Sequence, residues 1–225
     1  MSAARRSPVR RAYDATWGRF FAATYDRLMA KGEQGELGAR REAVVSRAEG
    51  RTLELGAGTG LNLSRYGSGV TELVLTEPFE PMARRLRERA AAEAAFPVEV
   101  VETPAERLPF ADDSFDTVVA TLVLCTVDDP AATLAEVDRV LKPGGRFLFF
   151  EHVRAESPRL ARAQDLLHGP WYFVGHGCHD NRDTAAAIGA SPLQIEDLER
   201  GEVAEMPPIV KPLIWGSARP QAPAR

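Results

Sequence analysis

The chain has 225 residues, of which 44% are hydrophobic and 27% are charged, a balance that is typical of a globular domain and excludes wholesale disorder. Its formal net charge of -4 at pH 7 provides no general attraction to nucleic acid or anionic lipid, so we expect no nucleic-acid partner. The length favours one domain with terminal additions over two domains.

The cysteines and the chain ends limit the function further. Cys125 and Cys178 are too few for a disulfide framework and lack the paired spacing of a zinc site, so we expect no metal and a reducing, cytoplasmic location. No stretch reaches the roughly 18 consecutive apolar residues of a transmembrane helix, so stable membrane insertion is not expected. Residues 1–14, which are rich in arginine, and residues 220–225 are expected to be disordered tails.

Two helices are predicted over residues 15–48. Apolar residues between Trp17 and Met29 recur at spacings of three and four, which predicts one buried helix face. Glycines between Gly32 and Gly38 end this helix, and residues 40–48 are predicted to form a second one. We expect both helices to cover the binding site described below.

Residues 49–219 are predicted to form the core domain. Short apolar runs at 53–55, 73–75, 98–101 and 117–124 alternate with helical or turn segments, of which 81–95 and 131–141 are the clearest helices. The stretch 142–145 stops the second helix before a fifth strand at 146–150. A helix at 160–167, an irregular stretch at 169–181 and strands at 193–198 and 209–215 follow. This alternation predicts an α/β fold with a mostly parallel, doubly wound sheet of seven strands and helices on both faces.

The glycine-rich segment E-L-G-A-G-T-G at residues 54–60 directly follows the first strand and precedes a predicted short helix at residues 61–66. Glycines allow a sharp turn there and leave no Cβ where a ligand approaches the backbone, although a purely structural turn fits the loop taken alone. The spacing of Gly56, Gly58 and Gly60 differs from the Gly-x-Gly-x-x-Gly of sites that bind a pyrophosphate, which disfavours a nicotinamide-dependent oxidoreductase. S-adenosylmethionine has no pyrophosphate, and Glu54 with the loop N–H groups suits its ammonium and carboxylate.

The ends of the next strands carry matching signals. Glu77 ends the second strand about 20 residues beyond the first glycine, where an acid accepts hydrogen bonds from ribose hydroxyls. The segment 105–110 follows the third strand, and 112–116 leads into the fourth. These strand ends are expected to converge on one crevice.

These motifs together resemble those of class I S-adenosylmethionine-dependent methyltransferases, which have a Rossmann-like fold, over residues 52–151. The resemblance is strongest to the quinone-biosynthesis branch and rests on E-L-G-A-G-T-G, Glu77-Pro78 with Met82, A-E-R-L-P-F, S-F-D and L-K-P-G-G. It implies a cofactor site in which Gly56, Gly58 and Gly60 wrap the methionine portion, Glu77 holds the ribose, Phe79 lies against the adenine, Ala105 and Glu106 reach the adenine edge, and Thr121 lines the sulfonium site.

Tyr25 resembles the N-terminal tyrosine that closes over the cofactor in such enzymes. It also lies on the apolar face of its predicted helix, so a packing role fits it equally well.

The part after the fifth strand resembles the thiol-methyltransferase-like proteins of animals and their bacterial relatives. The matching residues are F-F-E-H-V at 149–153, Trp171, Gly177-Cys178, R-D-T at 182–184 and the segment 212–218. The N-terminal hydrophobic anchor of the animal proteins is not matched, so membrane attachment is not implied.

We therefore expect methyl transfer to a small apolar acceptor, with a thiol as first choice and a quinone-like ring or a lipid amine behind it. His152, just past the fifth strand, is the candidate general base, although it fits a strand-end histidine as well. His168, Trp171 and Cys178 are expected to line the acceptor pocket. A noncatalytic S-adenosylmethionine-binding module is the alternative, because aligning two reactants requires no obligatory catalytic residue. The protein is expected to be a monomer or a homodimer.

Overall fold

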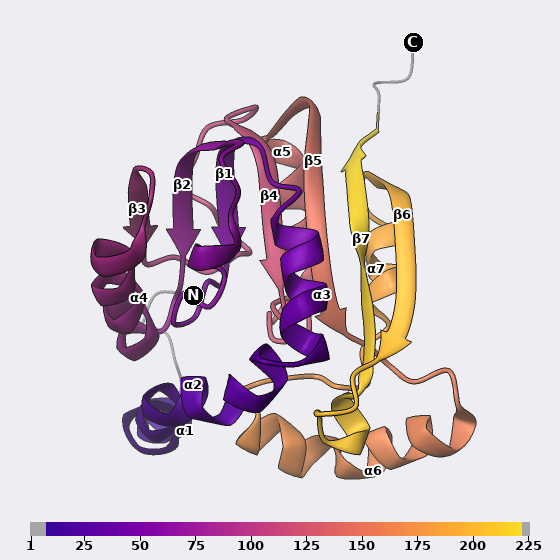
Figure 1. The fold of residues 1–225 in the computed structure, drawn as a ribbon. Coiled ribbons are helices and arrows are strands. Elements are labelled where there is room, and N and C mark those ends of the chain that lie inside the picture. The colour runs from indigo at the N-terminus through magenta and orange to yellow at the C-terminus, as the bar shows by residue number, and fades with distance from the viewer. Residues whose placement is uncertain (1–7, 222–225) are drawn as a thin grey trace.

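The computed structural model describes residues 8–221, and a seven-stranded sheet runs through its centre (Figure 1). Its strands are β1 (Gly50–Leu55), β2 (Val70–Thr76), β3 (Val98–Val101), β4 (Phe115–Thr121), β5 (Leu141–His152), β6 (Leu193–Glu202) and β7 (Pro212–Pro220). They lie in the order β3-β2-β1-β4-β5-β7-β6, and β7 is antiparallel to β5 and β6 while the other pairings are parallel. The predicted α/β fold, a single domain around a mostly parallel sheet of seven strands, is confirmed.

Both faces of the sheet are buried, as the uninterrupted apolar run at the end of β5 requires. Phe147 and Phe149 belong to one core cluster, whereas Leu148 and Phe150 belong to the other. Side chains alternate along a strand, so consecutive apolar residues occur only where both faces are covered. Each of these side chains is fully buried, which stabilises the fold by about 1.5–3 kcal/mol per residue.

Helices cover the two faces in pairs. The helices α3 (Glu36–Val45) and α4 (Glu80–Glu93) pack on the face of Leu148, whereas α5 (Pro130–Val140) and α7 (Thr184–Gly189) pack on the face of Phe147. Their positions on opposite sides of the sheet are visible in Figure 1. The predicted double winding is therefore present, with the short helix α7 as an element that the sequence pattern did not indicate.

The N-terminal segment crosses the edge where the parallel strands end. It consists of α1 (Pro8–Tyr13), a π-helical turn (Asp14–Gly18) and α2 (Arg19–Glu33), and these elements lie below the arrowheads of β1, β2 and β4 in Figure 1. The expected disordered tail is thus wrong for residues 8–14. The Tyr13 hydroxyl donates a hydrogen bond to the carbonyl of Phe173 at 2.7 Å and holds this stretch in place. The remainder of the two predicted tails, 1–7 and 222–225, lies outside the described residues, while β7 extends through Pro220.

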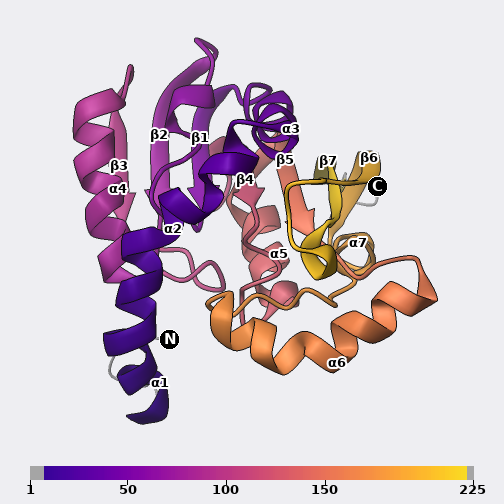
Figure 2. The same ribbon diagram turned by 60° about the horizontal axis from the view of Figure 1, so that its bottom comes forward.

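The helix α6 (Pro158–Val174) continues well beyond the predicted end at residue 167 and forms the long helix under the sheet in Figure 2. It includes Pro170, which removes one helical hydrogen bond and was expected to lie in irregular chain. Contacts with the N-terminal segment hold this last part of the helix. The indole N–H of Trp17 donates to the carbonyl of Val174 at 3.3 Å, next to the Tyr13 contact.

Three other boundaries differ from the sequence prediction for local reasons. β4 ends at Thr121 rather than at residue 124, because Leu122 adopts a φ of 61° and turns the chain out of the sheet. β5 begins at Leu141, and its register shifts across the predicted stop, where Gly144 has a φ of 82°. The helix predicted after the glycine loop is a single 3-10 turn, Leu63–Arg65.

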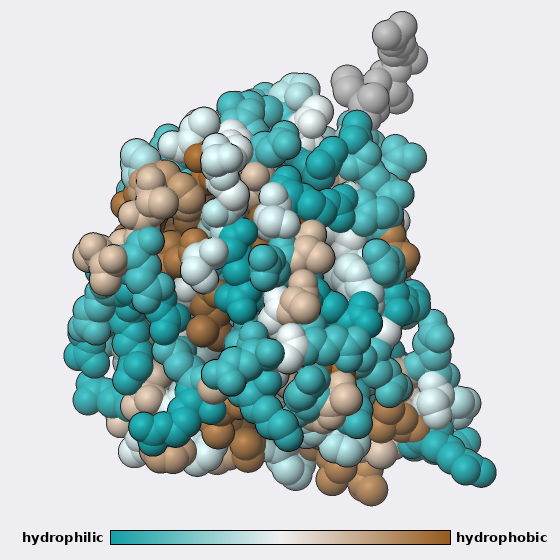
Figure 3. All heavy atoms as spheres, viewed as in Figure 1, coloured by the Kyte–Doolittle hydropathy of each residue, from teal (hydrophilic) through white to brown (hydrophobic). Residues whose placement is uncertain are grey.

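Apolar side chains are exposed on the helices α2 and α6. Brown atoms gather along the lower edge of Figure 3, where Figure 1 places α2 and α6. Among the described residues, no helix has the length and apolar character needed to cross a membrane. The exposed apolar residues of these two helices are Phe20, Leu28, Leu166, Leu167, Phe173 and Val174.

Candidate functional site

The glycine loop at residues 56–60 forms the tight turn that its sequence predicts. Gly56, Gly58 and Gly60 have φ values of 54°, 58° and 85°, in the left-handed region that favours glycine. The N–H of Ala57 donates to the carbonyl of Thr76 at 2.8 Å, which ties the loop to the end of β2. The loop therefore lies at the carboxyl edge of the sheet, where open α/β folds bind ligands.

Gly60 serves packing as well as conformation. A Cβ built on it would lie 2.9 Å from side-chain atoms of Leu63 and Leu86, whereas a Cβ on Gly144, which has nearly the same φ, would meet nothing within 4 Å. We expect Gly144→Ala to lower the free energy of unfolding by about 1–2 kcal/mol through backbone strain alone. Gly60→Ala should cost about 1 kcal/mol more because of overpacking. Urea denaturation of both variants measures the difference, and equal losses would contradict the packing role.

Glu77 links the loop to the end of β2 through both oxygens of its carboxylate. One oxygen accepts the N–H of Gly58 at 2.9 Å and the other accepts the N–H of Phe79 at 2.8 Å. Each carboxylate oxygen has a second lone pair, so these contacts leave it able to accept a further hydrogen bond from a ligand hydroxyl. The structure thus places Glu77 beside the loop, and its ribose contact stays a prediction.

A small cavity of about 20 Å³ opens beside the loop. It brings together a tyrosine from α2, an arginine from α3, residues of the loop and the end of β4. Such a volume holds a single water molecule. The lining residues are Tyr25, Arg41, Glu54, Gly56, Ala57, Gly58, Leu61, Asn62 and Thr121.

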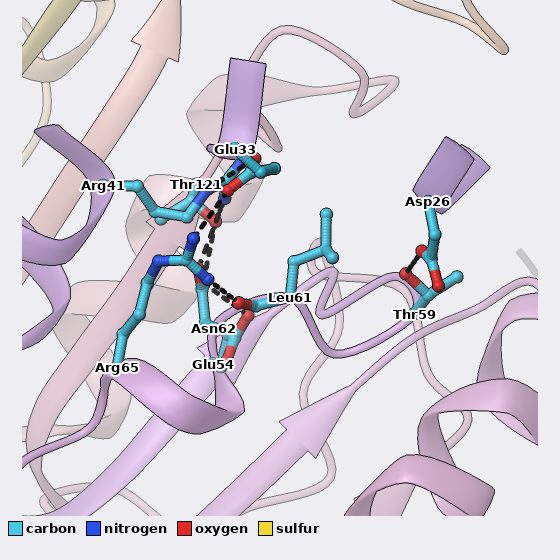
Figure 4. Close-up of polar contacts among 9 residues, drawn as sticks. All are labelled: Asp26, Glu33, Arg41, Glu54, Thr59, Leu61, Asn62, Arg65 and Thr121. Carbon is cyan, nitrogen blue, oxygen red and sulfur yellow. Dashed lines mark hydrogen bonds and ion pairs between the residues drawn. The ribbon is translucent and has the colours of Figure 1, made fainter. Parts of the chain in front are cut away.

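A buried polar network connects the walls of this cavity (Figure 4). The guanidinium of Arg41 donates to the Thr121 hydroxyl at 2.8 Å and to the Asn62 carbonyl oxygen at 3.3 Å, and it pairs with Glu33 at 2.9 Å. The Asn62 amide donates to Glu54 at 2.8 Å and to Thr121 at 2.9 Å. The network therefore fixes α2, α3, the end of β1, the turn after the glycine loop and the end of β4 relative to one another.

The charges in the cavity are opposite and close. Burial raises the pKa of Glu54, while hydrogen bonds from the Tyr66 hydroxyl and the Asn62 amide, together with the charge of Arg41, act in the opposite direction. Burial also raises the pKa of Tyr25 to about 12, so its hydroxyl is neutral at physiological pH. A carboxylate and a guanidinium that face one cavity can together bind a zwitterionic amino-acid group.

The sequence interpretation missed Arg41 and Asn62. Arg41 lies at helical spacing from Leu37, Val44 and Val45, which are all buried, and its own side chain is only 3% exposed. A charged residue on the apolar face of a helix is a signal that could have identified it.

Several predicted cofactor residues do not line the cavity. Phe79 packs against Ala22 and Met82 and against the ring of His176, at a centroid distance of 4.8 Å. Pro78 is exposed and Ala105 belongs to the core. The Glu106 carboxylate accepts the N–H groups of Asp128 and Asp129 at 2.8 and 3.4 Å, so it holds the start of α5. The cofactor contacts expected for Pro78, Phe79, Ala105 and Glu106 stay predictions.

A second cluster lies past the ends of β4 and β5 and contains His152, the candidate base. Its Nδ1 is 3.9 Å from the sulfur of Cys125 and 3.7 Å from the sulfur of Cys178. All three residues are buried, and Nε2 of His152 has no hydrogen-bond partner among the described residues. A hydrogen bond from the Cys125 thiol, followed by the contact with His152, holds the pKa of the Cys178 thiol well below its usual value.

The other residues predicted for the acceptor pocket lie at the end of α6. The imidazole of His168 contacts Asp180 at 3.2 Å and stacks on His179, with ring centroids 5.0 Å apart. The indole nitrogen of Trp171 is buried and has no hydrogen-bond partner in the described part of the chain. The acceptor pocket made of His168, Trp171 and Cys178 stays a prediction.

Comparison with known proteins identifies the family of this chain. Residues 53–149 match the family model described as "Methyltransferase domain". The chain is 37% identical over 152 residues to thiol S-methyltransferase TMT1B of Rattus norvegicus, covering 65% of this chain and 61% of that protein. It is 30% identical over 201 residues to thiol S-methyltransferase TMT1A of Homo sapiens, covering 88% of this chain and 82% of that protein. The match thus spans about three fifths of the rat protein and a larger share of the human one.

Solved structures agree with the fold. The YcgJ protein of Bacillus subtilis is 26% identical with a TM-score of 0.57, and the match covers 72% of this chain and 70% of that one. An S-adenosylmethionine-dependent methyltransferase of Thermotoga maritima has a TM-score of 0.67 over 91% of this chain and 98% of its own, at 21% identity. This second likeness supports the fold alone.

Proposed function

Because the chain belongs to the S-adenosylmethionine-dependent methyltransferase family, we propose that it transfers the methyl group of S-adenosylmethionine to the sulfur of a small apolar thiol. The choice of a thiol as the acceptor rests on the similarity to thiol S-methyltransferases, which extends beyond the cofactor-binding half of the chain. The match to the human TMT1B protein covers 74% of this chain at 36% identity, and the match to TMT1A covers 88%. Both extend past the segment that the family model describes.

The residues at the carboxyl edge of the sheet fit the cofactor. Arg41 would hold the carboxylate of its methionine end, Glu54 its ammonium, and Glu77 its ribose hydroxyls. The Cβ-free position at Gly58 lets the ligand approach the backbone, since a Cβ there would meet only Met82, at 4.0 Å. When bound, the cofactor supplies a methyl group on a positively charged sulfur, which is an activated leaving group.

The described conformation is closed over this site. Asp26 of α2 accepts a hydrogen bond from the Thr59 hydroxyl and pairs with Arg89 at 2.8 Å. The cavity beneath it holds about 20 Å³, far less than a nucleoside, so α2 has to move for the cofactor to bind. Closure then excludes water and aligns the two reactants, which contributes about 7–11 kcal/mol to catalysis.

Replacement of Tyr25 tests whether α2 covers the bound cofactor. We expect Tyr25→Ala to weaken S-adenosylmethionine binding about tenfold, because the cofactor loses the apolar cover that Tyr25 gives to the cavity. Phe20→Ala is the matched control, since Phe20 lies on the same helix with 55% of its side chain exposed. Calorimetric titration of both variants decides between the roles. Equal affinities would leave Tyr25 a packing residue.

A thiol acceptor makes the smallest chemical demand on the protein. A thiol is a far stronger acid than an alcohol or a carbon acid, with a pKa of about 8.5 for the cysteine side chain, so a weaker base yields the nucleophile. His168, Trp171 and Cys178 are the residues we propose for the acceptor pocket. The two cysteines are free thiols in the structure, which fits the reducing cytoplasm that we propose as the location.

The test is a product assay with S-adenosylmethionine that carries a deuterated methyl group. The protein is incubated with hexanethiol, a reduced quinone or a long-chain amine, and products are identified by mass spectrometry. We expect labelled hexyl methyl sulfide as the main product, and Glu77→Ala should form much less of it. A labelled quinol or amine instead would contradict the thiol assignment. Cofactor binding without any product would favour the noncatalytic module.

A further inference from the structure

The cluster of Cys125, His152 and Cys178 places two sulfur atoms and one imidazole nitrogen around one point. Their ligand atoms all lie within 4.8 Å of one another, and none of the three residues is more than 6% exposed. Thiolate sulfur and imidazole nitrogen are the donors that zinc prefers in proteins. The residues come from three separate segments, so their spacing along the sequence did not indicate a metal site.

The two sulfur-to-nitrogen distances are close to those around a tetrahedral ion. Zinc bonds of about 2.3 Å to sulfur and 2.0–2.1 Å to nitrogen place neighbouring sulfur and nitrogen donors about 3.6 Å apart. The corresponding separations here are 3.9 Å for Cys125 and 3.7 Å for Cys178, both measured to Nδ1 of His152. Shifts of a few tenths of an ångström in the side chains would bring both separations to the tetrahedral value.

The backbone holds the three residues in place before any ion binds. The N–H of His179, next to Cys178, donates to the carbonyl of Cys125 at 2.7 Å, which fastens the two cysteine loops together. The Glu151 carboxylate accepts the N–H groups of Val123 and Cys125 at 2.9 and 3.3 Å. His152 is fixed as the last residue of β5, opposite Leu213. A site that is already assembled loses little conformational entropy on binding.

We propose that Cys125, His152 and Cys178 bind one zinc ion whose remaining position takes the sulfur of the acceptor thiol. No fourth histidine, cysteine or carboxylate of residues 8–221 joins the group, so the protein leaves one coordination position unfilled. Three protein ligands with one open position are typical of catalytic zinc, whereas structural sites use four. The role in thiol binding rests on the proposed function, while the metal site itself does not.

The site lies beside the cofactor loop. Val123, two residues before Cys125, comes within 2.9 Å of the position that a Cβ on Gly56 would occupy. An acceptor held here would therefore approach from the edge that carries the glycine loop.

The reaction balances without another reagent. On binding, the acceptor S–H bond breaks and its proton passes to solvent, because a thiol that coordinates zinc is deprotonated. A sulfur lone pair then forms the bond to the methyl carbon, the bond from that carbon to the sulfonium breaks, and S-adenosylhomocysteine leaves. Two cysteine thiolates neutralise the charge of the zinc ion. The thiolate of the acceptor therefore gives the zinc complex a net negative charge, which is complementary to the positive sulfonium. Coordination through Nδ1 leaves a hydrogen on Nε2, so a zinc-bound His152 cannot also act as the general base.

Metal analysis of the full chain tests the site without an activity assay. The protein is purified with a reductant and zinc and then dialysed against a weak chelator. We expect about one zinc per chain in the wild type and at least a tenfold loss of zinc in Cys125→Ser, Cys178→Ser and His152→Ala. His179→Gln, which removes a neighbouring imidazole outside the cluster, should retain the metal. S-adenosylhomocysteine affinity reports whether each variant is folded.

Cobalt replacement tests the open position in the wild type, where folding is not in question. Hexanethiol should raise the thiolate-to-cobalt absorption by about half as a third thiolate joins two, while hexanol should not change it. A wild type without zinc, or one with a Cys125–Cys178 disulfide in its place, overturns the site, even if thiols are methylated. If zinc is bound but hexanethiol does not change the cobalt spectrum, the proposal that the acceptor thiol is a metal ligand is wrong. A spectrum that responds while only quinol or amine is methylated supports the site and contradicts the proposed function.

Discussion

Arg41→Met is expected to lower the free energy of unfolding by about 3–5 kcal/mol, the cost of removing one partner from a buried ion pair. The guanidinium is 3% exposed and lies between Glu33, Asn62 and Thr121. Methionine retains much of the apolar stem but leaves the Glu33 carboxylate, itself 9% exposed, without this cation. Arg65 still pairs with Glu33 at 2.9 Å, which limits the loss.

Arg40→Met is the matched control for this effect. Arg40 precedes Arg41 on the same helix, but it is 32% exposed and pairs with Glu36 one turn away. A partly exposed pair of this kind contributes about 0–1 kcal/mol, and the guanidinium lies 4.2 Å from the ring centroid of Trp215, a contact of about 0.5–1 kcal/mol, so the control should lose at most about 2 kcal/mol. Urea denaturation of both variants supplies the comparison. Equal losses would show that the polar network around Arg41 does not stabilise the fold.

Glu77→Ala is expected to weaken S-adenosylmethionine binding by about 1.5–3 kcal/mol, or roughly 10- to 150-fold, the scale of a lost hydrogen bond to a charged group. The substitution removes the proposed acceptor for the ribose hydroxyls. It also frees the N–H groups of Gly58 and Phe79, so the loop loses its link to the end of β2. Calorimetric titration measures the affinity.

The control for Glu77 is Glu80→Ala, which removes an exposed acid three residues further along the chain. We expect its affinity for the cofactor to equal that of the wild type. Thermal unfolding of both variants separates a loosened loop from a lost ligand contact. Unchanged affinity in Glu77→Ala would reject the ribose assignment.

The sequence predicts the fold because its signals are local and agree with one another. Apolar runs such as residues 147–150 of β5 mark strands buried on both faces, and the alternation of such runs with helical segments marks a parallel sheet. The errors arise where distant contacts decide the structure. The end of α6 past Pro170 is held by Tyr13 and Trp17, which lie far away in the chain.

The same distinction applies to the site. The glycine loop and Glu77 are recognisable because each directly follows a strand, and the structure places them together at one edge. The partners of Arg41 lie on three other segments, so its role emerges only from the fold. Sequence spacing likewise could not place Cys125 beside Cys178, because spacing rules describe ligands on one short motif.

The most direct test of the account is calorimetric titration of the full chain with S-adenosylhomocysteine, the product that the proposed reaction leaves behind, alongside a reduced nicotinamide dinucleotide. The cavity carries a glycine loop with left-handed backbone, a buried guanidinium and a carboxylate, and Glu77 accepts the N–H of Gly58 in this loop. We predict binding of S-adenosylhomocysteine at one site per chain, at least tenfold weaker binding in Glu77→Ala, and no binding of the dinucleotide. Absence of S-adenosylhomocysteine binding, or preference for the dinucleotide, would show that this cavity is not an S-adenosylmethionine site.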